Sequence, residues 1–286
     1  MAYPYLIQGK NIVVVIDNKS HTVSSTHPTY QKVLDAIKAA DWATVKDIIE
    51  PKQVVLNYGK GNISIQGEKL FWKGYEFHNA LATRMIKMMQ DGFPVEPMAN
   101  FMENLMQSPS NRAVKELYGF LEKNNLPITS DGYFLAYKRI NKEFLDCYTR
   151  TVNNKPAYLM TAEEVAALKA TPAVTKLGVT TSIEQDADGK DVTVVSMDRN
   201  RVDDKAENTC SVGLHFCSES YLPHYPGEII VILKINPADV VSIPTDYNNA
   251  KGRTFRYQVV GQLGVNPDEA FTTSVQNDAN QPAAKW

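Results

Sequence analysis

The sequence predicts an α+β protein, and three observations carry this prediction. Short β-branched runs open the chain and return through its second half. Three amphipathic helical patterns lie between them, and a break near residues 125–131 separates the two kinds of pattern. We therefore expect an N-terminal region over residues 1–128, where small sheets accompany a helical cluster. A C-terminal region over residues 129–263 should form a mixed or antiparallel sheet with few helices, followed by a polar, mobile tail over residues 264–286.

The N-terminal region begins with strand chemistry. Residues 11–17 and 20–23 predict two strands joined by a tight turn. From Tyr30 the apolar side chains recur at helical spacing, and Asp41 is a potential N-cap that divides this stretch into two short helices. Strand chemistry returns over residues 53–77.

Three helical patterns follow, each marked by apolar side chains three or four residues apart. The first two hold six of the nine Met residues, and Met-rich surfaces can form adaptable binding grooves. We instead interpret these Met side chains as core, because they alternate with charged and amide residues. Ser108-Pro109 predicts the N-cap and first turn of the third helix. The apolar residues of the three helices are Leu81, Met85, Met88 and Met89; Met98, Phe101, Met102, Leu105 and Met106; and Val114, Leu117, Phe120 and Leu121.

The C-terminal region is mostly β in character, apart from an insertion. Residues 156–193 predict a surface insertion that contains a helix and a hairpin. A capping box from Thr161 to Glu164 starts the helix, and Asp188-Gly189 turns the hairpin. The predicted strands are residues 133–140, 144–149, 213–217, 228–236, 239–243 and 254–260.

The charge balance and the cysteine count exclude several classes of protein. Lys and Arg number 30 against 32 Asp and Glu, a net charge of −2, so we expect no strong nucleic-acid binding. Three Cys are too few for a disulfide framework. No apolar stretch approaches the roughly 18 residues needed to span a bilayer, and the N-terminus lacks a signal-peptide pattern. We expect a soluble chain inside the cell.

The densest cluster of reactive side chains is Cys210, His215 and Cys217, with His224 nearby. In an extended segment His215 and Cys217 share a face, which would favour joint ligation of zinc. The spacing fits none of the familiar zinc patterns, so ordinary packing is the interpretation that we favour. A nucleophilic site would need Cys147, Cys210 or Cys217 with His215 as base, and no local motif supports one. We expect no cofactor.

A basic and aromatic segment occupies residues 251–257. Its Lys251, Arg253 and Arg256 could contact phosphates, but three positive charges on one strand are more typical of a solvated face. We favour the solvated face.

Several local strings are more distinctive than any short motif. They are Phe101–Met106, Ser108–Ser110, Thr129–Lys138, Phe144–Cys147, Arg201–Asp204, Thr209–His215, Asp239–Asn248 and Lys251. In their order and approximate spacing, from about residue 10 to residue 263, they resemble the rIIB proteins of T-even and related bacteriophages.

Two departures limit what this resemblance implies. The T-even proteins carry an additional N-terminal segment that looks like a helix-turn-helix, and this chain is expected to start after it. Any DNA-binding role of that segment is therefore not carried over. The insertion at residues 156–193 is absent from the T-even type and is a candidate for a partner-specific surface.

The resemblance implies an early phage protein that acts in the infected bacterium. Proteins of this family work with a second phage protein, rIIA, and protect infection against exclusion by a prophage's membrane-depolarising system. They also influence lysis timing and associate with the host membrane fraction. We therefore expect a rIIA-like partner, contact with host or prophage defence proteins, and a location in the host cytoplasm. Membrane contact at the inner membrane should be indirect, since no basic amphipathic helix is evident. The oligomeric state stays open.

A second resemblance keeps an enzymatic or nucleotide-binding function open. Gly213–Phe216 followed by Ser218, Ser220 and Tyr221 is similar to a segment of ADP-ribosyltransferases. Residues 133–140 would then be the first nicotinamide-contacting strand, and residues 255–260 would carry the catalytic Glu.

Gln258 stands where that Glu is expected, and its amide lacks the required charge. This resemblance implies a degenerate member that binds a nucleotide-like ligand without catalysis. Its candidate residues are Tyr137, Lys138, His215, Ser218, Tyr221 and Gln258. A virion structural component is a third possibility.

Overall fold

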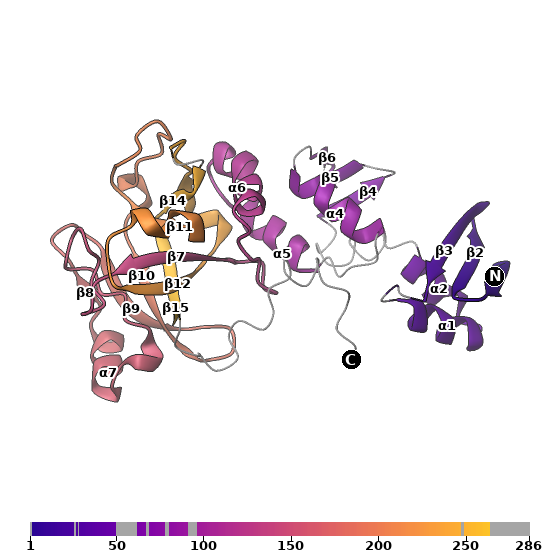
Figure 1. Cartoon of the computed structure of the whole chain (residues 1–286), viewed down its shortest axis with the longest axis horizontal. Coiled ribbons are helices and arrows are strands. Elements are labelled where there is room, and N and C mark those ends of the chain that lie inside the picture. Colours follow the sequence, from indigo (N-terminus) through magenta and orange to yellow (C-terminus); the bar gives the residue numbers. More distant parts are fainter. Residues whose placement is uncertain are drawn as a thin grey trace. The chain divides into compact units, whose positions relative to one another are not determined.

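The computed structural model describes residues 2–25, 27, 29–49, 62–66, 69–77, 80–90, 96–246 and 249–263. Two compact units divide the chain at residues 100 and 101 (Figure 1). The boundary suggested by the sequence, near residues 125–131, falls inside the second unit. Residues 53–61 of the stretch with predicted strand chemistry, residues 53–77, and the predicted tail lie outside the described residues.

The first unit opens with an antiparallel sheet in the order β1-β2-β3. Every second residue of β2 is buried, and these aliphatic side chains pack on two helices. Asp17 and Asn18 make the tight turn between β2 and β3 with positive φ, and Asp41 accepts a hydrogen bond from the Thr44 N–H at the start of α2. The predicted N-cap is confirmed, and the tight turn lies at Asp17-Asn18, one residue earlier than predicted. The elements are β1 (Tyr5–Gln8), β2 (Asn11–Ile16), β3 (Lys19–Ser24), α1 (Tyr30–Lys38) and α2 (Trp42–Ile49).

A second small antiparallel sheet follows in the order β4-β5-β6, and α4 packs on β5. Met85 and Met88 of α4 are buried, as are Met98 and Met102 of α5. The core interpretation of these four Met side chains is therefore confirmed. The elements are β4 (Ile63–Gln66), β5 (Lys69–Trp72), β6 (Tyr75–Glu76), α4 (Ala80–Gln90) and α5 (Glu96–Leu105).

Helix α6 (Asn111–Lys123) begins two residues later than the sequence suggested. Ser110 is the N-cap, and its hydroxyl accepts a hydrogen bond from the Ala113 N–H. The Ser108-Pro109 prediction is wrong, because the extended backbone of Ser110 places Pro109 outside the helix. Buried Phe120 meets Phe216 edge-to-face at 5.9 Å, which seats α6 against the large sheet.

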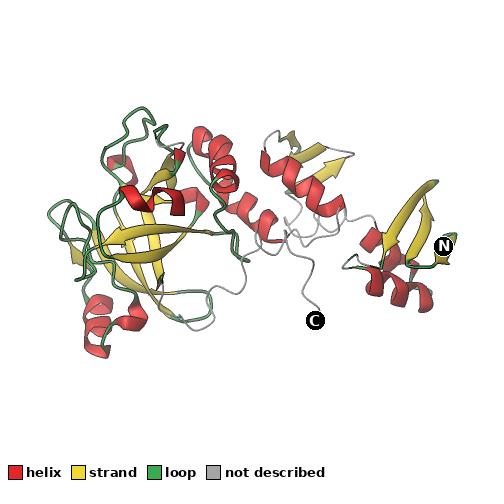
Figure 2. Cartoon of the chain, viewed as in Figure 1, coloured by secondary structure: helices red, strands yellow, loops and turns green. Residues whose placement is uncertain are grey.

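The second unit is built on a nine-stranded antiparallel sheet in the order β13-β14-β11-β7-β12-β15-β10-β9-β8 (Figure 2). The α+β class is confirmed. The strands are β7 (Phe134–Ile140), β8 (Ala173–Val174), β9 (Thr180–Gln185), β10 (Asp191–Ser196), β11 (Leu214–Cys217), β12 (Ile229–Ile235), β13 (Val240–Ser242), β14 (Lys251–Thr254) and β15 (Arg256–Gln262). Short 3-10 helices are η1 (Ala157–Leu159), η2 (Arg199–Arg201), η3 (Glu219–His224) and η4 (Pro237–Asp239).

Residues 156–193 contribute both a surface helix and part of the sheet. Helix α7 (Ala162–Ala170) has no buried residue and carries the predicted capping box between Thr161 and Glu164. The predicted hairpin is also present, since β9 and β10 pair and Gly189 turns between them with φ +78°. Because β10 pairs along β15, this hairpin extends the main sheet.

Strand β14 corrects the interpretation of residues 251–257 as a solvated face. Lys251 is 4% exposed and Arg253 is fully buried. The Arg253 guanidinium donates to the backbone oxygens of Lys205 and Asn208 and to the Ser242 hydroxyl. Backbone carbonyls, which no sequence pattern reveals, compensate for the burial of this charge.

No helix within the described residues is long and apolar enough to cross a membrane.

Candidate functional site

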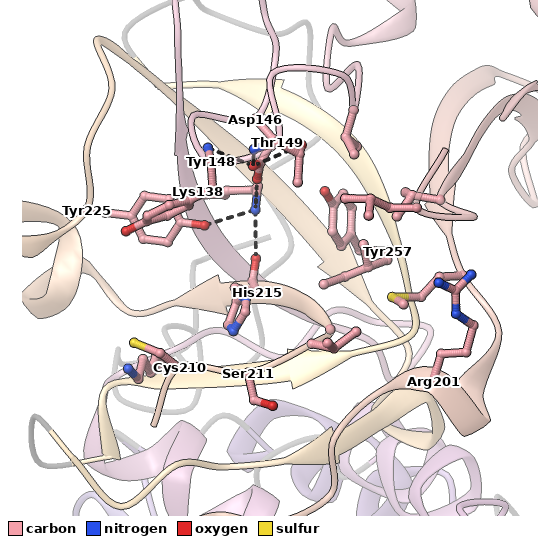
Figure 3. A pocket seen from close by; sticks show the side chains of 18 of the residues that line it. Lys138, Asp146, Tyr148, Thr149, Arg201, Cys210, Ser211, His215, Tyr225 and Tyr257 are labelled. Carbon is pink, nitrogen blue, oxygen red and sulfur yellow. Dashed lines mark hydrogen bonds and ion pairs between the residues drawn. The ribbon is translucent and has the colours of Figure 1, made fainter. Parts of the chain in front are cut away.

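A cavity of about 420 Å³ opens in the second unit beside β7 and β11 (Figure 3). Its walls come from the strands β7, β11, β14 and β15, from η2 and η3, and from the loops that follow β7 and β10 and precede β9 and β11. The polar lining includes one buried ion pair, one imidazole and several phenols. This volume lies in the range of small-molecule sites, roughly 300–1,000 Å³.

Alternation along β7 places Lys138 at this cavity. Phe134, Ala136, Lys138 and Ile140 occupy one face of the strand, and all four are buried. A Lys at the third of these positions brings a charge onto an otherwise apolar face. Such a buried charge requires nearby partners.

The partners of Lys138 come from three separate segments. Its Nζ lies 2.8 Å from Oδ2 of Asp146 and donates to the hydroxyl of Tyr225 at 2.9 Å (Figure 3). It also approaches the backbone oxygen of His215 at 3.4 Å. Since these three acceptors match the three hydrogens of an ammonium group, Lys138 is fully satisfied by the protein.

Asp146 is held by its own loop as well as by Lys138. Its Oδ1 accepts hydrogen bonds from the N–H groups of Tyr148 and Thr149, each at 3.0 Å. These bonds close a turn over residues 146–149, so the predicted strand at residues 144–149 is wrong. A carboxylate that bonds the backbone two and three residues later favours a turn over a strand.

Both members of the buried pair stay charged. Burial opposes ionisation of Asp146, but Lys138 and the two N–H donors outweigh it and hold its pKa below the ordinary range. Burial also opposes the charge on Lys138. The phenols of Tyr225 and Tyr257 and the Asp146 carboxylate outweigh that effect and raise its pKa.

The titratable side chains of β11 itself, His215 and Cys217, are neutral. Burial, with help from Lys138 and Arg253, lowers the pKa of His215 to about 4, so its imidazole is uncharged at neutral pH. Burial raises the pKa of the Cys217 thiol to about 12, and this thiol donates to the backbone oxygen of Tyr137. An inert, protonated thiol suits packing better than nucleophilic catalysis.

Aromatic rings form one wall of the cavity. Tyr225 meets Tyr148 edge-to-face at 5.9 Å and Tyr221 at 6.2 Å between ring centroids. Burial raises the pKa of Tyr225 to about 12, and it also raises that of Tyr257. The Tyr257 hydroxyl donates to Asn154, so both phenols remain protonated hydrogen-bonding groups.

Comparison with known proteins identifies the family. The family model described as "Bacteriophage T4 protein rIIB" matches residues 3–165 and 162–270. "Protein rIIB" of Enterobacteria phage T4 is 34% identical over 254 residues, which cover 88% of this chain and 70% of that relative. The chain belongs to the bacteriophage rIIB family. No solved structure matches this rIIB-family chain.

The structure separates the candidate site residues into two groups. Lys138, Cys210, His215 and Tyr221 line the cavity of this rIIB-family protein. The remaining candidates do not line it, namely Tyr137, Cys217, Ser218 and Gln258.

Those four candidates make other contacts in the sheet. Tyr137 and Cys217 are paired across β7 and β11. Buried Ser218 hydrogen-bonds to the backbone oxygen of Ala250, and Gln258 lies between β10 and β12. In the described part of the chain, no group of three His, Cys, Asp or Glu side chains could hold a metal ion.

Sequence reasoning missed several cavity residues, among them Asp146, Arg201, Tyr225 and Tyr257. One signal was present, because Lys138 on the apolar face of a strand implies a buried counter-charge. The two Tyr residues gave no such signal, since Tyr225 is 87 positions from Lys138 and only the fold brings them together.

Proposed function

We propose that this rIIB-family chain acts during infection as an accessory protein that works by contact with other proteins. It protects phage growth against exclusion by a resident prophage or host defence, and it influences lysis timing. Membership of the rIIB family carries this proposal. Its partners are a rIIA-like phage protein and defence proteins of the host or prophage.

An exposed strand supports action by protein contact. All four residues of β1 are exposed, and Tyr5, Leu6 and Ile7 retain 51%, 56% and 44% of their accessible surface. Among the residues that the structure describes, β1 pairs with β2 alone and is an edge of its sheet. Apolar side chains on an open edge mark sites where another chain can bind.

The proposed location is the cytoplasm of the infected bacterium, at the inner membrane only through a partner. The rIIA-like protein would supply the membrane contact, and this chain would bind to it through β1.

Deletion of the gene from the phage tests the biological role. We expect the deletion phage to plate poorly on at least one exclusion-competent lysogen, to lyse cells at an altered time, and to recover when the chain is supplied in trans. Normal growth and lysis on every such lysogen would contradict the proposal.

Affinity capture from infected cells tests the contact. We expect the full chain to co-purify with the rIIA-like protein, and Leu6→Lys to lose it, because a charge on the exposed edge blocks apolar contact without disturbing the core. Val174→Lys is the matched control, since Val174 is 66% exposed on the edge strand β8. Equal capture by both variants would exclude β1 as the contact surface.

A further inference from the structure

The cavity of the second unit combines aromatic walls with a surplus of positive charge. We propose that it binds a small organic anion that carries an aromatic ring, with mononucleotides as the simplest representatives. This proposal does not depend on the contact through β1, because the cavity and β1 belong to different units.

The charges around the cavity favour an anion. Lys138, Arg201 and Lys251 line it, against the single carboxylate of Asp146. Lys138 is paired with Asp146, and Lys251 is paired with Asp246 at 2.8 Å. Arg201 is exposed, and no carboxylate in the described ranges makes an ion pair with its guanidinium. One positive charge therefore remains available to a ligand.

Arg201 has a defined place at the cavity. Its guanidinium lies over Gly178, where a Cβ atom would collide with Nη1. Gly178 also has φ +70°, which favours glycine at this position. Arg201 lies on the opposite side of the cavity from Tyr225 (Figure 3). A ligand would thus meet the cation at one end and aromatic rings at the other.

His215 provides hydrogen bonds between these two ends. Its ring lies at the centre of the cavity (Figure 3), and within the described chain no side chain hydrogen-bonds to it. A neutral imidazole has one donor and one acceptor nitrogen, as a heteroaromatic ligand requires. Lys138, by contrast, has no hydrogen left to donate.

The low pKa of His215 reflects its burial first and the positive charges around the cavity second. Burial lowers its pKa to about 4, and Lys138, Arg253 and Lys251 add to this effect, while Asp146 opposes it. The phenols of Tyr225 and Tyr257 also face the cavity and stay uncharged. A bound anion would reduce the net positive potential and therefore raise the pKa of His215.

The apolar lining suits a ring. Tyr148, Tyr221 and Tyr225 form an aromatic wall, and an aliphatic wall completes the site. Flat rings gain from edge-to-face and stacked contacts with such walls. The aliphatic wall consists of Val152, Leu177, Val179, Met197, Val212 and Leu214.

Calorimetry on the purified full chain at neutral pH and low salt tests the proposal with five probes. Adenosine monophosphate and uridine monophosphate carry both ring and phosphate, and indole-3-acetate carries ring and carboxylate. Adenosine lacks the charge, and inorganic phosphate lacks the ring. We expect at least one ring-bearing anion to bind at least about tenfold more tightly than adenosine or phosphate, because ring and charge both contribute.

Variants locate the binding. Arg201→Gln should weaken the best probe by about tenfold, whereas Arg112→Gln on α6, which lines no part of the cavity, should leave affinity unchanged. Val212→Asp should also weaken it, because Val212 is 56% exposed at the cavity and tolerates a charge. In wild type, saturation with the probe should raise the pKa of His215 measured by NMR.

Four outcomes would overturn the proposal. These are no binding by any of the ring-bearing anions, adenosine binding as tightly as its monophosphate, phosphate binding as tightly as the ring-bearing probes, or equal affinity in wild type, Arg201→Gln and Val212→Asp. Preference for phosphate over carboxylate, or the reverse, identifies the anionic group within the proposed class.

Discussion

In the first unit, β2, β3, α1 and α2 form one small module, the β2–β3 module. This module and the nine-stranded sheet of the second unit bury side chains of different chemistry. The module's core consists of seven buried aliphatic residues: Ile12, Val14, Ile16, Val33, Ala36, Ile37 and Val45. The second unit instead buries four charged side chains at or beside its large sheet: Lys138, Asp146, Lys251 and Arg253. Apolar packing is sufficient where strand and helix close directly on one another. Where the fold encloses a polar cavity, charges are buried and must be compensated one by one.

The buried ion pair of the second unit contributes more to the position of the cavity wall than to the free energy of unfolding. Replacing a buried ion pair with apolar residues is often neutral or stabilising, so Lys138 and Asp146 need not add much to the free energy of unfolding. The pair does join β7 to the loop at residues 146–149 and orients the Tyr225 hydroxyl. Its main consequence is a fixed cavity wall.

The largest expected effect comes from breaking this ion pair. Asp146→Ala leaves Lys138 buried without its counter-charge and should reduce the free energy of unfolding of the second unit by roughly 3–5 kcal/mol. Hydrogen exchange of the β7 and β12 amides measures this loss. The double variant Lys138→Met with Asp146→Asn should recover most of it, because the Asn oxygen still accepts from Tyr148 and Thr149. If Asp146→Ala lowered the free energy of unfolding by less than about 1 kcal/mol, Lys138 would not depend on Asp146 to compensate its buried charge.

Acid should reproduce part of that effect in wild type. The pKa of Asp146 is lower in the folded chain than its unfolded value of about 3.9, so its stabilising contribution is present above that pH and is lost as pH falls below it. Exchange of β7 amides should accelerate in acid, after correction for intrinsic rates, and Asp146→Asn should flatten this dependence. The stability of the aliphatic core of the first unit should show no comparable dependence on pH.

A half-buried carboxyl with weaker compensation, that of Asp239, should behave in the opposite way. Burial raises the pKa of Asp239 to about 6, and Arg256 offsets only part of this. Its folded pKa exceeds the unfolded value, so the acid form favours folding, and stability is lost as pH rises through about 6. Asp239→Asn should therefore stabilise the second unit by roughly 1–3 kcal/mol at pH 7.5 and have little effect at pH 4. Exchange at both pH values checks this, and equal effects would refute it.

An aliphatic substitution in the first unit should cost less than breaking the ion pair. Ile12→Val removes one methylene group from the core and should destabilise the β2–β3 module by about 0.5–1.5 kcal/mol at any pH. Trp42 packs against this core, so its fluorescence during urea denaturation reports the change. A strong pH dependence would show that the module also relies on buried charge.

The smallest effect is expected at the surface helix. Thr161→Ala removes the capping box of α7 and should cost about 1 kcal/mol of local helix stability. Since α7 has no buried residue, exchange should accelerate in α7 alone and remain unchanged in β10. Loss of protection in β10 would mean that α7 supports the sheet.

The strands and helices, which follow from local sequence patterns, could largely be predicted. The contacts of the site could not, because they join residues that lie far apart in the sequence. The β character of residues 133–140 and 228–236 identified β7 and β12 to within one residue at each end. The N-cap of α6 was misplaced because Ser108 and Ser110 are chemically equivalent. Lys251 and Arg253 were predicted to be solvated because their compensating groups are backbone oxygens and an acid from other loops. Asp146 was missed since its loop has the composition of a strand.

The strand order of the large sheet has a consequence for synthesis on the ribosome. The central neighbours β7, β12 and β15 begin at residue 134 and end at residue 262, so the sheet closes only when nearly the whole chain has been translated. The β2–β3 module, with α1 and α2, has all its elements within residues 5–49 and can close much earlier. A nascent chain stopped before residue 256 leaves the edges of β12 and β10 unpaired and open to aggregation.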